Sequence, residues 1–133
     1  MNDDTKKIKV AVIDDNQGLV QTIKSFLEMR NFIVNVAYGG RSGLEIIKKD
    51  SPDVIVLDIM MPDMDGRDVL IKLKDNKDTK DIPVIILSAK DEQFDRDYGI
   101  ELGAYEYVTK PYDSNILLRQ IANVLNKKGK GKL

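Results

Sequence analysis

Residues 54–58 have the sequence Val-Ile-Val-Leu-Asp, four consecutive apolar residues that end in an aspartate. A short apolar run without polar alternation is typical of a strand that is buried on both faces, as in a parallel sheet. Four further runs share this character: Ile8–Ile13, Phe32–Ala37, Val84–Leu87 and Tyr105–Thr109. We therefore expect five strands, each covered by other elements on both sides.

The segments between these runs show the spacing of amphipathic helices. Apolar residues recur at helical intervals in four of them: Leu19, Ile23, Phe26 and Leu27; Leu44 and Ile47; Val69, Leu70 and Leu73; Leu117, Ile121, Val124 and Leu125. A weaker pattern covers residues 92–102, and Gly103 is a predicted helix stop. Asp113 or Ser114 is the predicted cap of the last helix. Five strand–helix units predict an α/β fold, a three-layer sandwich with right-handed crossovers.

The composition limits the chemistry that this chain can perform. Its 133 residues suit one domain, and 42% hydrophobic residues are enough for a core. The absence of cysteine excludes disulfides and thiolate chemistry, and the absence of histidine excludes histidine metal sites and histidine general bases. Any chemistry must therefore come from carboxylates, hydroxyls, lysines, tyrosines and bound ions.

The charge and the chain ends favour a soluble, cytoplasmic protein. The formal net charge of -1 gives no overall attraction to nucleic acid or to anionic lipid, so we expect neither as a direct partner. Residues 1–7 are polar, and no apolar run approaches the roughly 20 residues that cross a bilayer. We expect one domain over residues 1–126, and residues 127–133 as a Lys/Gly-rich tail or the start of a linker.

Polar residues follow four of the five predicted strands. Asp14 and Asp15 end the first, Asp58 the third, Ser88 the fourth, and Thr109 with Lys110 the fifth. Ligands of open α/β sheets bind beyond the carboxyl ends of the strands, so these side chains are expected to meet at one rim.

Each residue type at this rim has a chemical use. Clustered carboxylates repel one another and suit a hard cation such as Mg²⁺, which also bridges to phosphate oxygens. A lysine supplies a point charge and a serine hydroxyl a donor for a phosphoryl group. Phosphoryl transfer needs mainly positioning and charge neutralisation. With its charge masked, one carboxylate can attack phosphorus and become an acyl phosphate.

These motifs together resemble the receiver domains of two-component response regulators, of the chemotaxis-regulator type. The resemblance covers roughly residues 7–126 and rests on four stretches in the family's order: Val12-Ile13-Asp14-Asp15, Val56-Leu57-Asp58 with the following Ile59-Met60-Met61-Pro62-Asp63-Met64-Asp65-Gly66, Ile86-Leu87-Ser88-Ala89, and Tyr107-Val108-Thr109-Lys110-Pro111. It implies a flavodoxin-like fold, with a five-stranded parallel sheet of order 2-1-3-4-5 and five helices.

The resemblance implies a metal site beside a phosphoacceptor. Asp58 matches the aspartate that is phosphorylated. Asp15 matches the direct Mg²⁺ ligand, Asp14 assists it, and the backbone carbonyl of Met60 completes the site. Mn²⁺ is expected to substitute for Mg²⁺.

The resemblance also implies a switch. Ser88 matches the hydroxyl that contacts the phosphoryl group, and Lys110 matches the lysine that contacts it, so Asp58, Lys110 and Ser88 form the catalytic set. The bond between Lys110 and Pro111 is cis in the family. Tyr107 matches the aromatic residue that turns inward when the hydroxyl moves, which alters the face formed by the fourth helix, fifth strand and fifth helix.

The function that follows is phosphoacceptance in a two-component phosphorelay. The donor is a histidine kinase or a histidine phosphotransfer protein, because this chain has no histidine of its own, and the recipient of the signal is a downstream output domain or protein. Such a receiver promotes its own phosphorylation and dephosphorylation but is not a turnover enzyme. A stand-alone receiver, a truncated regulator and a piece of a hybrid kinase are all compatible with the sequence.

Other readings of the same residues fit less well. A pseudo-receiver that acts only as a binding module is expected to lack the acidic pair, the aspartate or the lysine, and none is lacking. A calcium-binding EF-hand needs glutamate where Lys72 stands, and a haloacid-dehalogenase-type phosphatase needs aspartate where Met60 stands. We interpret Met60, Met61 and Met64 as packing residues and Gly66 as a turn residue.

Overall fold

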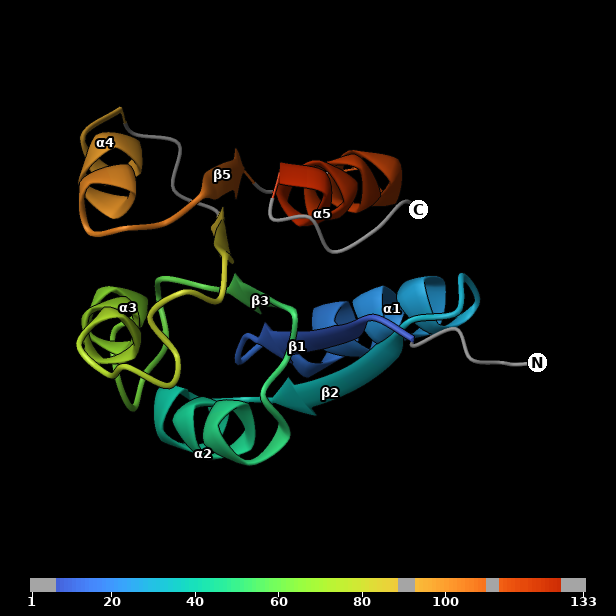
Figure 1. Ribbon diagram of the computed structural model, residues 1–133, viewed down its shortest axis with the longest axis horizontal. Helices are drawn as coiled ribbons and strands as arrows, with labels where there is room; N and C mark the ends of the chain where they lie inside the picture. Colours follow the sequence, from blue (N-terminus) through green and yellow to red (C-terminus); the bar gives the residue numbers. More distant parts are fainter. Residues whose placement is uncertain (1–6, 89–92, 110–112, 128–133) are drawn as a thin grey trace.

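The structure is a computed structural model that describes residues 7–88, 93–109 and 113–127, and only the backbone of residues 88, 93–96 and 109. Figure 1 shows a central sheet with helices on both sides. Lys110 and Pro111, which the sequence analysis singled out, lie outside the described residues.

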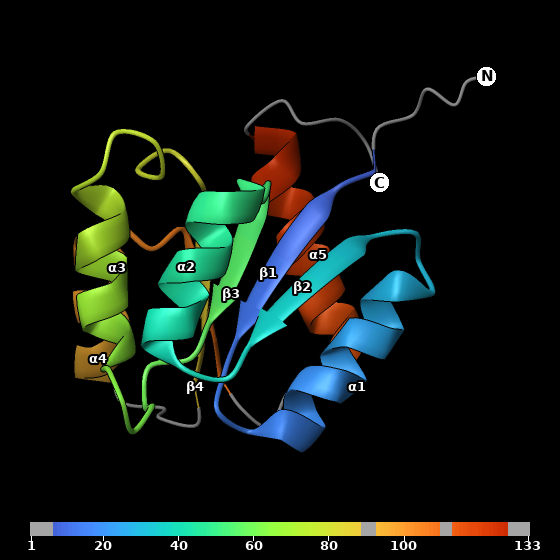
Figure 2. The same cartoon turned by 90° about the horizontal axis from the view of Figure 1, so that it is seen from below.

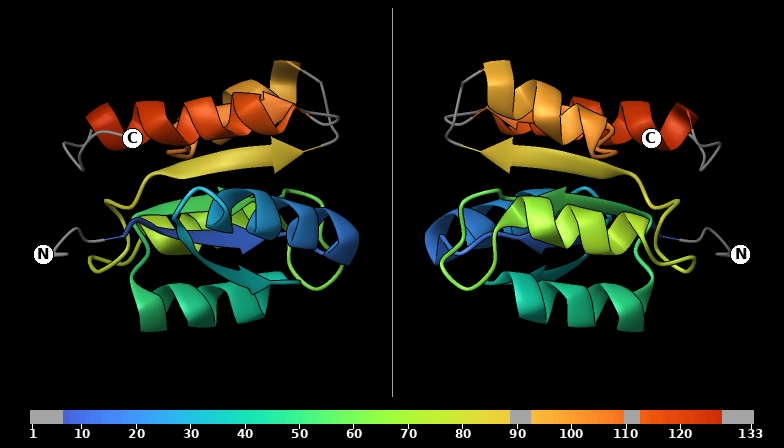
Figure 3. Two further views of the ribbon diagram at one scale, coloured as in Figure 1. Left: turned by 90° about the vertical axis from the view of Figure 1, so that its right-hand side faces the viewer. Right: turned by 90° about the vertical axis from the view of Figure 1, so that its left-hand side faces the viewer.

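The sheet has five parallel strands in the order β2-β1-β3-β4-β5. They are β1 (Lys9–Ile13), β2 (Ile33–Ala37), β3 (Val54–Leu57), β4 (Val84–Ser88) and β5 (Glu106–Thr109). The arrowheads in Figure 3 point to the same side of the molecule. This arrangement confirms the predicted fold, with strand boundaries that differ from the predicted runs by at most one residue.

Five helices cover the sheet: α1 (Gln17–Glu28), α2 (Gly40–Asp50), α3 (Gly66–Lys74), α4 (Gln93–Glu101) and α5 (Ser114–Lys127). Helices α1 and α5 lie on one face, and α2, α3 and α4 on the other (Figure 1). None of the helices in the described part of the chain has the length and apolar character that a bilayer span needs.

Most residues of the strands are apolar because each face of the sheet packs against helices. Side chains alternate along a strand, so Val10 and Val12 point into a core with α1 and α5, whereas Ala11 and Ile13 point into a second core with α2 and α3. All four are buried. This double burial explains why the strands carry no polar alternation.

Local signals fix most of the helix ends. Asn16 caps α1 by accepting the backbone N–H of Leu19 at 3.1 Å. Asp113 caps α5 by accepting the N–H of Asn115 at 2.7 Å, which confirms one of the two predicted caps. Gly103 follows α4 with a φ of 109°, in the region that favours glycine, and confirms the predicted helix stop.

Candidate functional site: an acidic pocket at the strand ends

Two acidic residues at the site continue directly from neighbouring strands. Asp14 follows β1 and Asp58 follows β3, which pair in register up to Ile13 and Leu57. The backbone N–H of Asp58 donates to the carbonyl of Ile13 at 2.9 Å, so the pairing extends to the site itself. Both side chains are almost fully buried, with Asp14 1% and Asp58 4% exposed. The sheet therefore sets the backbone positions of both residues.

Asp15 completes a compact carboxylate cluster. One carboxylate oxygen from each of Asp14, Asp15 and Asp58 lies within 4.8 Å of the other two. Asp15 is exposed, so the cluster opens to solvent on its side. Three carboxylates this close repel one another unless a cation lies between them. Oxygen ligands at this spacing suit Mg²⁺, which takes one or two protein carboxylates and keeps several waters.

The turn between β1 and α1 holds Asp14 in place. Its backbone N–H donates to the carbonyl of Ala37 in β2 at 3.1 Å, and its Oδ1 accepts the backbone N–H of Asn16 at 2.9 Å. Because Asn16 in turn caps α1, the carboxylate is linked to the start of that helix. In Figure 2 the loops that follow β1 and β3 gather at the lower edge of the molecule.

A glycine lets the loop between β3 and α3 fold tightly behind Asp58. A Cβ added at Gly66 would lie 2.1 Å from the carbonyl oxygen of Asp58 and 2.7 Å from the Cα of Ile59. The N–H of Gly66 also donates to the carbonyl of Ile59 at 2.7 Å. The structure thus corrects the expected role of Gly66, because close backbone approach, and not turn conformation, requires the glycine here.

Asp65 secures the start of α3 next to this glycine. Its Oδ1 accepts the backbone N–H of Arg67 at 2.8 Å, and its Oδ2 lies 3.1 Å from the Arg67 guanidinium. Partial burial raises the pKa of Asp65, but the hydrogen bonds from Arg67 outweigh this effect and hold the pKa below its usual value. The carboxylate therefore stays ionised as an N-cap, the form that the positive end of the helix favours.

The remaining predicted site residues lie at neighbouring strand ends. Ser88 is the last residue of β4 and pairs with Thr109 of β5, and Lys110 comes directly after that strand but lies outside the described residues. Tyr107 lies in β5, only 7% exposed, in the core with α2 and α3. The structure thus brings Asp14, Asp15 and Asp58 together and places the end of β4 one strand away.

The three methionines of the loop after Asp58 differ in burial. Met61 is buried, and Met64 packs against the core with α2 and α3. Met60 is 55% exposed, so its interpretation as a packing residue was wrong. It follows Ile59, which takes the core position, and its own side chain is exposed at the surface.

Sequence reasoning missed the role of Asp63 in the same loop. Its carboxylate accepts backbone N–H groups of Gly40 and Arg41 at the start of α2. Its partners lie more than twenty positions earlier in the chain, and no local pattern joins them to Asp63.

Comparison with known proteins identifies the class to which this pocket belongs. Residues 10–122 match the response regulator receiver domain family. The chain therefore belongs to the receiver domains of response regulators.

Individual relatives agree with this assignment. The chain is 37% identical to the response regulator PleD of Caulobacter vibrioides over 116 residues, 87% of this chain and 26% of PleD. It is similar in structure to the receiver domain of the Francisella response regulator 1452, with a TM-score of 0.83, 36% identity, and 92% and 99% of the two chains covered.

A third relative was solved in an activated form. The BeF3-activated N-terminal receiver domain of RstA from Klebsiella pneumoniae has a TM-score of 0.79, 26% identity, and 85% and 94% of the two chains covered. The chain spans between 26% and 53% of the length of the curated relatives PleD and ArlR.

Proposed function

We propose that this receiver accepts a phosphoryl group on Asp58 and passes the signal on by a change of conformation. The observation that carries the proposal is the cluster of Asp14, Asp15 and Asp58 at the ends of paired strands in a receiver fold. Asp58 is the proposed acceptor because it directly follows β3, where the resemblance to receiver domains implies the phosphorylated aspartate.

The chemistry follows from the residues at the rim. A carboxylate oxygen of Asp58 attacks the phosphorus of a phosphohistidine on the donor, a P–O bond forms as the P–N bond breaks, and the imidazole nitrogen takes up a proton. Mg²⁺, held by Asp14, Asp15, Asp58 and the Met60 carbonyl, would neutralise the charge of the attacking carboxylate and of the phosphoryl oxygens. Mn²⁺ is the proposed substitute.

Two further residues are proposed to hold the transferred group. Lys110 places a positive charge beside the phosphoryl oxygens, and the hydroxyl of Ser88 donates a hydrogen bond to them. Ser88 ends β4, which lies next to β3 in the sheet. Lys110 directly follows β5, which is the next strand along. The negative charge that the phosphoryl group adds at Asp58 is compensated only when the side chains of Lys110 and Ser88 approach it.

The same approach is proposed to drive the switch. Movement of Ser88 toward the phosphoryl group leaves space that Tyr107 occupies, and the face formed by α4, β5 and α5 changes with it. A shift from one almost pure state to the other needs about 5 kcal/mol of differential stabilisation, and partial switching needs less.

The partners follow from what this chain lacks and what its family does. The chain contains no histidine, so a histidine kinase or a histidine phosphotransfer protein is the proposed donor. A downstream output domain or protein that binds the face formed by α4, β5 and α5 is the proposed recipient. The proposed receiver domain covers residues 1–126 and acts in the cytoplasm, without direct binding to nucleic acid or membrane.

Phosphorylation with a small donor tests the proposal directly. The chain is incubated with acetyl phosphate and Mg²⁺ and measured by intact-mass spectrometry. We expect addition of one phosphoryl group, and no addition when a chelator removes the metal, because the carboxylate cluster then keeps its repulsion. A chain that binds Mg²⁺ yet stays unlabelled would favour the pseudo-receiver, a binding module without phosphoryl chemistry.

The lifetime of the acyl phosphate is expected to depend on Met60. This apolar side chain is exposed, two residues after Asp58 in the chain, and is a poor partner for an attacking water, so decay should be slow. Exchange of Met60 for Asn is expected to speed decay several-fold, measured as loss of the added mass over time. The matched control is Met29→Asn, at an exposed position after α1. Equal decay in all three proteins would contradict the role of Met60.

A further inference from the structure

The start of α2 lacks a cap from its own segment. Gly39 stands at the N-cap position and has no side chain that could accept a hydrogen bond. The first backbone N–H groups of any helix have no partner within the helix and need an acceptor from elsewhere. At α1, α3 and α5 a local Asn or Asp provides it, so α2 depends on another part of the fold.

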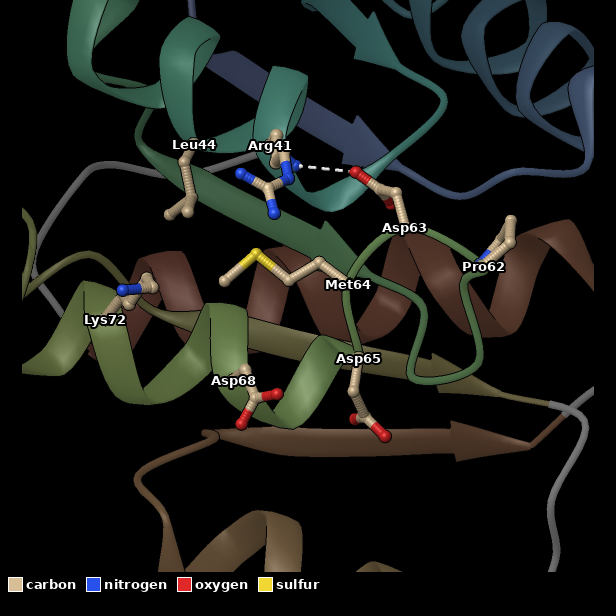
Figure 4. A pocket seen from close by; sticks show the side chains of 8 residues that line it. All are labelled: Arg41, Leu44, Pro62, Asp63, Met64, Asp65, Asp68 and Lys72. Carbon is tan, nitrogen blue, oxygen red and sulfur yellow. Dashed lines mark hydrogen bonds between the residues drawn. The ribbon is translucent and has the colours of Figure 1, made fainter.

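Asp63 supplies the missing cap from the loop between β3 and α3. Its Oδ1 accepts the N–H of Gly40 at 2.9 Å. Its Oδ2 accepts the N–H of Arg41 at 3.2 Å, and Figure 4 shows the contact between Asp63 and Arg41. These hydrogen bonds hold the pKa of Asp63 below its usual value, so the carboxylate is ionised. A negative charge at this place also interacts favourably with the positive end of α2.

The loop fits against α2 because two glycines leave room for it. A Cβ added at Gly39 would lie 3.0 Å from Oδ1 of Asp63, and one added at Gly40 would lie 2.8 Å from the Cβ of Met64 and 2.9 Å from Val69. Both glycines precede or start the helix that the loop caps. The contact therefore combines two hydrogen bonds with a closely packed backbone.

The capped loop carries two of the four proposed metal ligands. It begins at Asp58, contains Met60, and returns at Gly66, whose N–H donates to the carbonyl of Ile59. That hydrogen bond fixes the base of the loop, whereas Asp63 fixes its outer part to α2. Beside it, an open pocket of about 610 Å³ lies between α2 and α3 and is lined by Asp63 and Met64 of this loop (Figure 4).

We propose that Asp63 is a positioning residue that holds this loop, and with it the Met60 carbonyl, in the geometry that binds Mg²⁺. The inference rests on the proposed function, because it assumes that Mg²⁺ binds at Asp58 and Met60. Residues that orient metal ligands without touching the metal commonly affect affinity, since a ligand held in place loses less freedom on binding.

A different effect of Asp63 must be separated from positioning. Its negative charge alone would attract a divalent cation over a distance, without any role for the cap. Two conservative variants make the distinction. Asp63→Asn removes the charge but keeps an oxygen that can accept from one of the two N–H groups, whereas Asp63→Glu keeps the charge but changes the reach of the side chain.

The experiment measures the dissociation constant for Mg²⁺ by isothermal titration calorimetry in the unphosphorylated chain. We expect Asp63→Ala to bind Mg²⁺ about 10-fold more weakly than the unchanged protein, and Asp63→Asn within about threefold of it. Asp63→Glu is expected to lie close to the Ala variant. The control is Thr79→Val, which removes a buried hydrogen bond to the Leu73 carbonyl and lowers the melting temperature by about 4 °C, without a change in affinity.

Each outcome decides the inference. The inference is overturned if Asp63→Ala binds Mg²⁺ as tightly as the unchanged protein. It is also overturned if the affinity follows the charge of residue 63, so that the Asn variant resembles the Ala variant and the Glu variant resembles the unchanged protein. A loss of Mg²⁺ affinity in Thr79→Val as large as that in Asp63→Ala also overturns the inference, because general destabilisation of the fold would then explain the weaker binding. If the Ala variant does not fold, the comparison of Asn with Glu still decides. Absence of Mg²⁺ binding in the unchanged protein would count against the proposed function itself.

Discussion

Exchange of Asp58 for Asn is expected to abolish phosphorylation of the chain by acetyl phosphate while leaving the fold intact. Asn has nearly the same shape as Asp, and the backbone N–H of residue 58 still donates to the carbonyl of Ile13. Its amide is not a nucleophile for phosphorus, so the acyl phosphate cannot form. Intact-mass measurement should show no added phosphoryl group under conditions that label the unchanged protein fully.

The stability of this variant gives a second readout. Loss of one of three clustered negative charges relieves repulsion, so in the absence of Mg²⁺ the melting temperature should stay equal or rise. The matched control is Asp75→Asn, at an exposed position at the end of α3, which should be labelled like the unchanged protein. Continued labelling of Asp58→Asn would place the acceptor elsewhere, with Asp14 and Asp15 as the next residues to test.

Exchange of Gly66 for Ala is expected to be the most destabilising single change in the site. The new Cβ would lie 2.1 Å from the Asp58 carbonyl oxygen, and backbone atoms at the end of a buried strand cannot move aside. We expect a loss of about 3 kcal/mol in the free energy of unfolding, from overpacking alone. Mg²⁺ affinity should fall as well, because relief of the clash must displace the loop that follows Asp58.

Gly18 provides the matched control for this change. An added Cβ there would meet only Oδ1 of Asn16, at 3.7 Å, an ordinary contact. Because Gly18 lies in α1, Ala should stabilise the protein by about 0.5 kcal/mol through helix propensity. Urea unfolding of both variants gives the comparison. If Gly66→Ala is tolerated as well as Gly18→Ala, then the close approach at the end of β3 is not rigid.

The sheet and its acidic rim were predictable from sequence because their signals are local. A strand buried on both faces must be apolar throughout, so the run from Val54 to Leu57 predicted a buried strand, whereas the strand order came from the resemblance to receiver domains. The aspartates come directly after such runs, and parallel strands bring their carboxyl ends to one edge. Asp14 and Asp58 therefore follow from strand assignment together with pairing.

What sequence did not predict depends on contacts between distant segments. Asp63 follows a proline in the loop between β3 and α3 and has the character of a turn residue. Its partners at Gly40 and Arg41 become neighbours only when α2 and α3 pack side by side on the sheet. Gly66 was assigned to a turn because its close approach to the Asp58 carbonyl exists only once the loop has folded back, and the sequence alone does not show this contact. Met60 was wrongly interpreted as a packing residue. Beyond the end of β3 an apolar residue need not be buried, and the side chain of Met60 is exposed.

The pairing of β1 with β3 also determines when the acidic pocket can first exist during folding. Val10 pairs with Val54, and the whole of α1, β2 and α2 lies between them in the chain. Contacts this far apart in sequence form late, because the entropy of closing a long loop must be overcome first. A nascent chain that has made only its first strand, helix and second strand therefore has Asp14 and Asp15 but no Asp58. Coordination of a cation by all three carboxylates thus becomes possible only once the middle of the sheet has assembled, which ties competence for signalling to complete synthesis of the first three strands.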